Sequence, residues 1–159
     1  MSYTRELGEV SASGVSQAGM RALTMKSGTV ARFVATGSFT RGDFGLYRWE
    51  MPASTGGATG HFHRTFSESF YVLEGNPSFF DGETWAEGGP GFFLFVPQGG
   101  IHGFKNESLT PATFLILFSP GIAREGYFEA LAEIGATGRQ MSKADWDELY
   151  ARFDQTMVE

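Results

Sequence analysis

Short apolar runs alternate with clusters of turn-forming residues across the central part of the chain, residues 29–119. Gly, Pro, Asn and Asp separate the runs, and Asp81-Gly82 is typical of a hairpin turn. This pattern predicts β-strands in a sandwich or a closed barrel, because a long open meander would leave unpaired edges. The expected strands are Val30–Phe39, Gly45–Met51, His61–Phe66, Phe70–Leu73, Ser78–Phe80, Gly91–Val96, Ile101–Lys105 and Ala112–Phe118.

After residue 119 the apolar residues follow a helical spacing. A first helix is expected to follow Pro120 and to end near Gly135. A second helix is expected to begin at Ser142, where Asp145 stands in the position of a capping box. We expect its apolar face to pack on the β-structure or on a neighbouring subunit. The residues of that face are Trp146, Leu149, Tyr150, Phe153 and Met157.

Three segments follow from these patterns. Residues 1–28 are rich in Ser, Gly and Ala and are expected to form an arm with short strands, which packs on a partner subunit or frays. Residues 29–119 are expected to form the β-structure, a sandwich or a closed barrel. Residues 120–159 are expected to form a helical segment that packs on this β-barrel or sandwich, or on a partner.

Composition narrows the possible functions. The chain has 22 Gly among 159 residues, together with 16 Phe, 5 Tyr and 3 Trp, which fits a many-turned β protein with an aromatic interior. It has no Cys, which excludes disulfides, thiolate metal sites and cysteine nucleophiles. The net charge of −6 and the lack of a basic cluster argue against nucleic acid as a partner.

The longest apolar run, Phe114–Phe118, is too short to cross a membrane, so no membrane partner is expected. The first ten residues lack the apolar core of a signal peptide. We therefore expect a cytoplasmic protein.

The three histidines of the chain fall in two glycine-framed segments. His61 and His63 are two residues apart, so on a strand their imidazoles point to the same face. Glu68 follows after four residues and can supply an anionic ligand. In the second segment, Pro97 and Gly99 predict a turn that brings His102 back beside the first pair.

Three imidazoles and one carboxylate suit one divalent transition metal ion, whether Fe, Mn, Ni, Cu, Co or Zn. We therefore predict a metal site formed by four residues: His61, His63, Glu68 and His102. Four protein ligands leave two positions of a six-coordinate ion open for water, dioxygen or substrate.

These two segments resemble the two motifs of the cupin superfamily. The second motif matches at every position, which are Gly91, Pro97, Gly99, His102 and Asn106. The first motif matches from His61 to Gly75. It departs only at its leading glycine, where this chain has Thr55. The resemblance implies an all-β fold, a cupin jelly-roll β-barrel with the metal inside and one or two C-terminal α-helices outside.

The segments Glu68–Gly75 and Phe95–Pro97 also resemble the quercetin-dioxygenase-like branch of small cupins. That resemblance implies that Glu68 acts as a catalytic base toward a substrate hydroxyl, and that two subunits form a homodimer. Three side chains share the face of the expected ligands and are expected to line the pocket: Phe70, Val72 and Phe104.

Fold alone does not decide function, so three hypotheses follow from the site. The leading one is a metal-dependent dioxygenase acting on a small aromatic or phenolic substrate. A redox-neutral isomerase, cyclase or lyase would use the same metal as a Lewis acid. A non-catalytic barrel that binds a small molecule is the third.

Overall fold

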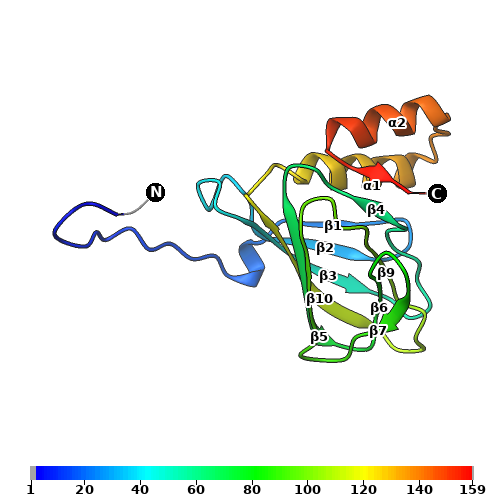
Figure 1. Ribbon diagram of the computed structural model, residues 1–159, viewed down its shortest axis with the longest axis horizontal. Coiled ribbons are helices and arrows are strands. Elements are labelled where there is room, and N and C mark those ends of the chain that lie inside the picture. The colour runs from blue at the N-terminus through cyan, green and yellow to red at the C-terminus, as the bar shows by residue number, and fades with distance from the viewer. Residues whose placement is uncertain (1–2, 159) are drawn as a thin grey trace.

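Antiparallel β-sheets in two layers and two C-terminal helices form the described part of the protein, as the sequence predicts (Figure 1). The computed structural model describes residues 3–158, so residues 1, 2 and 159 of the expected terminal segments lie outside the described part. The strands are β1 (Ala22–Thr24), β2 (Val30–Ala35), β3 (Gly45–Met51), β4 (His61–Phe62), β5 (Ser67–Glu74), β6 (Ser78–Phe80), β7 (Trp85–Glu87), β8 (Phe93–Val96), β9 (Gly103–Lys105), β10 (Ala112–Ser119) and β11 (Thr156–Met157). The helices are a short 3₁₀ helix (Gln17–Gly19), α1 (Glu125–Thr137) and α2 (Lys143–Arg152).

The larger sheet has six strands in the order β1-β2-β3-β10-β5-β8. A second layer consists of β7-β6-β9 and of the pair β11-β4, which backbone bridges connect at His61–His102 and Thr55–Asn106. Strands β7 and β11 are absent from the sequence prediction. Each is only two or three residues long, which is too short for alternation to reveal.

Alternating burial along β3 shows how the sequence sets the two faces of the large sheet. Tyr47, Trp49 and Met51 point into the core, whereas the intervening side chains lie on the outer face. On that outer face the Glu50 carboxylate accepts hydrogen bonds from two arginines, Arg32 and Arg48, at 2.9 and 2.8 Å. Strand β3 therefore has an apolar face toward the core and an outer face that carries charged side chains, as a strand in a barrel wall does.

Aromatic side chains fill the barrel interior in two groups. One group lies around Phe70, whose ring centroid is 5.2 Å from that of Phe79 and 5.8 Å from that of Phe104. The second lies around Phe128 of α1, whose ring is 5.3 Å from Tyr47 and 5.1 Å from Trp49. Helix α1 thus inserts an aromatic ring into the barrel and closes one side of the core.

The two helices differ from the prediction mainly in their ends. Helix α1 ends at Thr137 with Gly138 in the left-handed conformation, so Gly135 lies within the helix and is not its stop. Helix α2 begins as predicted, since Ser142 and Asp145 form a capping box. It ends at Arg152, and the chain then returns to the barrel as β11, beside β4.

Residues 3–16 form no helix or strand and extend away from the barrel (Figure 1). Three apolar side chains of this segment, Leu7, Val10 and Val15, are exposed. The arm and the homodimer remain predictions, because the structure describes one chain.

Candidate metal centre

The main chain itself brings the two histidine segments together. His61 and His102 form an antiparallel bridge in which each backbone N–H donates to the other's carbonyl oxygen at 2.9 Å. The Gly99 N–H donates to the His63 carbonyl oxygen at 2.7 Å. Glu68 stands near the start of β5, which pairs with both β8 and β10. The turn predicted around Gly99 therefore does return His102 to the first pair.

Glycine is required where the chain turns into this region. Gly75 ends the first motif with φ of 78°, and a Cβ there would lie 2.4 Å from the Pro111 carbonyl oxygen. Such a position excludes every larger residue by both conformation and space.

Four ligand-capable side chains converge inside the barrel: His61, His63, Glu68 and His102. One ligand atom from each lies within 4.8 Å of all the others. Glu68 Oε2 is 2.8 Å from His102 Nε2 and 3.1 Å from His63 Nε2. All four side chains are buried, so the cluster is not a chance meeting of surface groups.

The tautomer of each histidine is set by a backbone carbonyl. Nδ1 of His61 donates to Thr59 O at 2.7 Å, Nδ1 of His63 to Asp154 O at 2.6 Å, and Nδ1 of His102 to Gly100 O at 3.0 Å. Because a carbonyl oxygen only accepts, each Nδ1 carries the proton. Each Nε2 therefore faces the cluster, where those of His63 and His102 lie beside Glu68 Oε2. In the neutral ring with the proton on Nδ1, Nε2 would offer its lone pair to a cation, which is the arrangement seen in protein metal sites.

The electrostatics of the cluster also suit a cation. Burial alone would raise the pKa of Glu68, but the charges and hydrogen bonds of His102 and His63 outweigh it and hold the pKa well below its usual range. Burial, reinforced by His102, lowers the pKa of His61 to about 3. For His102 the Glu68 carboxylate outweighs burial and raises the pKa. The site thus holds an ionised carboxylate and at least one imidazole that stays neutral. This donor set fits a divalent transition metal.

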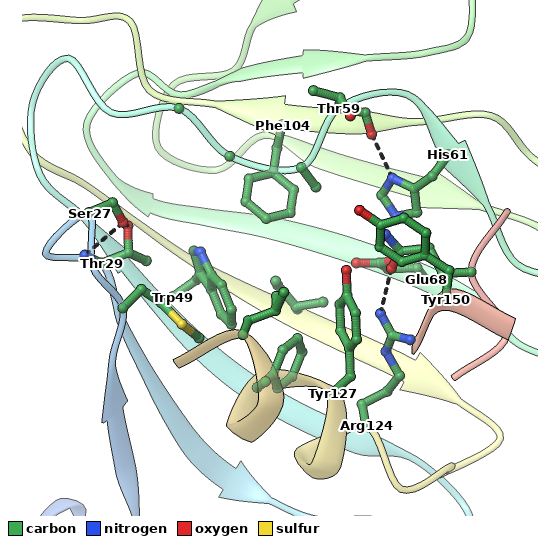
Figure 2. Close-up of a pocket in the computed structure, with 18 of the residues that line it drawn as sticks. Ser27, Thr29, Trp49, Thr59, His61, Glu68, Phe104, Arg124, Tyr127 and Tyr150 are labelled. Carbon is green, nitrogen blue, oxygen red and sulfur yellow. Dashed lines mark hydrogen bonds between the residues drawn. The ribbon is translucent and has the colours of Figure 1, made fainter. Parts of the chain in front are cut away.

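A cavity of about 370 Å³ leads to this cluster. Figure 2 shows His61, Glu68, Arg124, Tyr127 and Tyr150 together at one end of the cavity. Trp49 and Phe104 lie along its walls, and Ser27 and Thr29 are at the far end (Figure 2). The cavity is therefore aromatic along its length and polar where the ligand-capable side chains lie.

Of the three predicted pocket residues, the structure places one on the cavity. Phe104 lines it, whereas Phe70 and Val72 are fully buried in the core and do not. The reasoning from strand parity correctly points both side chains inward. Strand parity does not reveal that other phenylalanine rings fill the space around Phe70.

Two residues of the site carry no sequence signal. Asp154 follows α2 and supplies the carbonyl oxygen that fixes His63, and its carboxylate accepts hydrogen bonds from Arg64 N, Thr65 N and Thr65 Oγ1. Arg124 precedes α1 and lines the cavity beside Glu68. Helix α2 also contributes Trp146 and Tyr150 to the cavity, beyond the packing expected of its apolar face.

Comparisons with known proteins agree with this architecture. Residues 47–118 match the family model described as "Cupin domain". A comparison with curated proteins gave no match. Neither helix in the part of the chain from residue 3 to 158 is both long and apolar enough to cross a membrane.

Several solved structures are similar. The polyketide cyclase RemF from Streptomyces resistomycificus has a TM-score of 0.58 and 26% identity, and the match covers 69% of this chain and 80% of that one. KdgF from a Halomonas species has a TM-score of 0.59 and 20% identity, covering 69% and 94%. An RmlC-like cupin from Shewanella frigidimarina has a TM-score of 0.59 and 21% identity, covering 74% and 96%. The last two support the fold alone.

Proposed function

Since this chain belongs to the cupin superfamily, we propose that it is a metal-dependent enzyme that converts a small aromatic or phenolic molecule through an enolate or phenolate. One observation carries this proposal. The buried cluster of three histidines and Glu68 lies at the end of an aromatic cavity, so a planar ligand in the cavity would place a polar atom at the cluster. The proposed ligands are those of the sequence prediction: His61, His63, Glu68 and His102.

A divalent transition metal bound there would supply Lewis acidity toward a carbonyl or phenol oxygen. The side chains supply the rest. Glu68 has one oxygen, Oε2, at the imidazoles, while Oε1 makes no hydrogen bond among the described residues. In this proposal Oε1 accepts a proton from a substrate hydroxyl or an acidic C–H group, which is the role of a general base.

A redox-neutral reaction such as a ring closure is the first candidate. The solved structure with 26% identity is a polyketide cyclase, a relation that exceeds likeness of fold alone. In addition, the positive charge of Arg124 at the same end of the cavity would stabilise a developing enolate.

A dioxygenase is the second candidate. It is favoured by the open coordination positions that four protein ligands leave and by the resemblance of residues 68–75 to the quercetin-dioxygenase-like branch. A redox-active metal would then be needed, whereas the first candidate tolerates zinc.

The experiment begins with elemental analysis of the protein as purified. The protein is then loaded separately with Zn²⁺, Fe²⁺ or Ni²⁺ and assayed on a panel of flavonols, catechols and poly-β-carbonyl aromatics, in air and without oxygen. Turnover of the zinc form without oxygen would support the first candidate, and oxygen uptake only by the iron or nickel form would support the second. No turnover with any metal would contradict the proposal and favour a binding protein.

Glu68→Gln provides the matched test of the base, with Glu50→Gln as control. Both changes remove one carboxylate charge, but Glu50 lies on the outer face of the large sheet. We expect the first to lower kcat by about 100-fold or more and the second to leave it within twofold. Equal activity of the two variants would rule out Glu68 as the base.

A further inference from the structure

Arg124 is a buried cation without a carboxylate partner. The residue is 3% exposed, and the ion pairs of residues 3–158 do not include it. Nη1 donates to the Phe153 carbonyl oxygen at 2.6 Å, and Nη2 donates to Gln155 Oε1 at 3.0 Å. Nε has no acceptor. Buried charged groups are normally paired, so this guanidinium has unused capacity for an anion.

The aromatic side chains around Arg124 favour the binding of an anion there. The guanidinium carbon lies 4.4 Å from the ring centroid of Tyr127, 5.5 Å from that of Phe118 and 5.6 Å from that of Phe66. Aromatic faces compensate part of a cationic charge. They also exclude water, and in a medium of low dielectric constant the attraction for an anion grows.

The charges along the cavity are predominantly positive, although the whole chain carries −6. Glu68 is the only carboxylate among the residues that line the cavity, against two cations, Lys26 and Arg124. Glu68 is also the main charge that offsets the burial of Arg124. A divalent cation at the proposed centre would engage Glu68. Arg124 would then lie in the same cavity as that cation, and a bound anion would be needed to neutralise the remaining positive charge.

We propose that Arg124 binds the carboxylate of an aromatic acid, which makes it the residue that selects an anionic ligand for this cavity. The planar guanidinium matches a carboxylate in shape and in charge. The aromatic ring of the ligand would lie along the walls formed by Trp49, Phe104 and Tyr127. This inference rests on the proposed function, because it names the class of molecule that the same site takes.

Arg124 also has a structural role, since its two hydrogen bonds hold Phe153 and Gln155 of the C-terminal segment. A purely structural role and a recognition role make different predictions. If Arg124 only supported the fold, its replacement would weaken all ligands to the same extent. If it binds an anion, its replacement would change the preference between ligands of different charge.

The test is calorimetric binding of two probes of nearly equal shape, 2-naphthoate and the neutral 2-naphthalenemethanol, to the zinc-loaded protein. We expect the wild type to bind 2-naphthoate about tenfold more tightly or better, and Arg124→Met to reduce this preference to about twofold or less. Arg124→Lys keeps the charge and should retain part of the preference. Arg48→Met is the matched control, because Arg48 lies on the outer face of the sheet, and it should leave the preference unchanged.

Equal binding of the two probes by the wild type, or a preference that survives in Arg124→Met, would overturn the inference. Because Arg124 is buried, its variants are checked by thermal unfolding and by zinc content. A crystal structure of the zinc-loaded wild type with 2-naphthoate serves if the Met variant does not fold. A carboxylate away from the guanidinium would then refute the inference. Neither measurement involves turnover, so a failed activity assay contradicts the proposed function without touching this result.

Discussion

Hydrogen bonds of Asp154 connect the C-terminal segment to the proposed metal centre. Replacing Asp154 with asparagine should therefore lower both the stability of the fold and the affinity for metal. Its carboxylate accepts hydrogen bonds from Thr65 Oγ1 at 2.6 Å, from Thr65 N at 2.7 Å and from Arg64 N at 3.0 Å. Its carbonyl oxygen accepts from His63 Nδ1. Asp154 has φ of 50°, which asparagine adopts as readily as aspartate, so the change removes the charge and leaves the backbone conformation available.

The size of the effect follows from these contacts. A hydrogen bond to a charged group contributes about 1.5–3 kcal/mol, but Asp154 is only half-buried and water would replace part of the loss. We therefore expect Asp154→Asn to lower the free energy of unfolding by about 2 kcal/mol. Since outer contacts that orient a ligating histidine contribute about 10- to 100-fold to metal affinity, zinc binding should weaken by about tenfold. Urea unfolding and competition with a colorimetric chelator measure the two effects.

Asp81 offers a control in the turn between β6 and β7. Its carboxylate accepts from Glu83 N, Thr84 N and Thr84 Oγ1, which is the same kind of contact set as that of Asp154, but it lies outside the metal cluster. Asp81→Asn should leave zinc affinity unchanged within twofold. If both variants bind zinc as the wild type does, Asp154 does not position His63, and the reasoning is wrong.

Three further predictions concern stability, each measured by urea unfolding. Gly57→Ala should lower the free energy of unfolding by about 1–3 kcal/mol, because the added Cβ would lie 2.2 Å from the Phe104 carbonyl oxygen. In Gly56→Ala the added Cβ meets no atom within 4 Å, so this control should lower the free energy of unfolding by less than about 1 kcal/mol. Ser142→Ala removes the capping box of α2 and should cost about 1 kcal/mol; an unchanged midpoint would contradict this role. Hydrogen bonds from Arg32 and Arg48 lower the pKa of Glu50, so the ionised carboxylate stabilises the fold above pH 4.5 and this stabilisation is lost as pH falls through the lowered pKa. The difference in free energy of unfolding between wild type and Glu50→Gln should therefore shrink on acidification. A difference that stays constant with pH would refute this role of Glu50.

The sequence predicts that the four side chains of the cluster come together, because this depends on local spacing. His61 and His63 share a strand face, and the turn at Gly99 returns His102 to them, so short-range rules suffice. The start of α2 is predictable for the same reason, since a capping box spans only four residues.

The remainder of the site depends on contacts between distant parts of the chain. Asp154 lies beside His63 because β11, which follows it, returns to pair with β4, and a two-residue strand leaves no pattern in the sequence. Arg124 comes from another segment, between β10 and α1. Phe70 and Val72 show a second limit, because alternation tells which side chains point inward but not whether the space they enter is filled.

The cavity and the ligand cluster come from different parts of the chain, and this has an evolutionary consequence. The four proposed ligands lie within residues 47–118, which match the family model. Much of the cavity wall comes from outside that region, from residues 25–29, 124–131 and 146–157. Changes in these flanking segments would therefore reshape the cavity while the four ligand-capable side chains stay in place, so the cavities of relatives should diverge faster than this cluster.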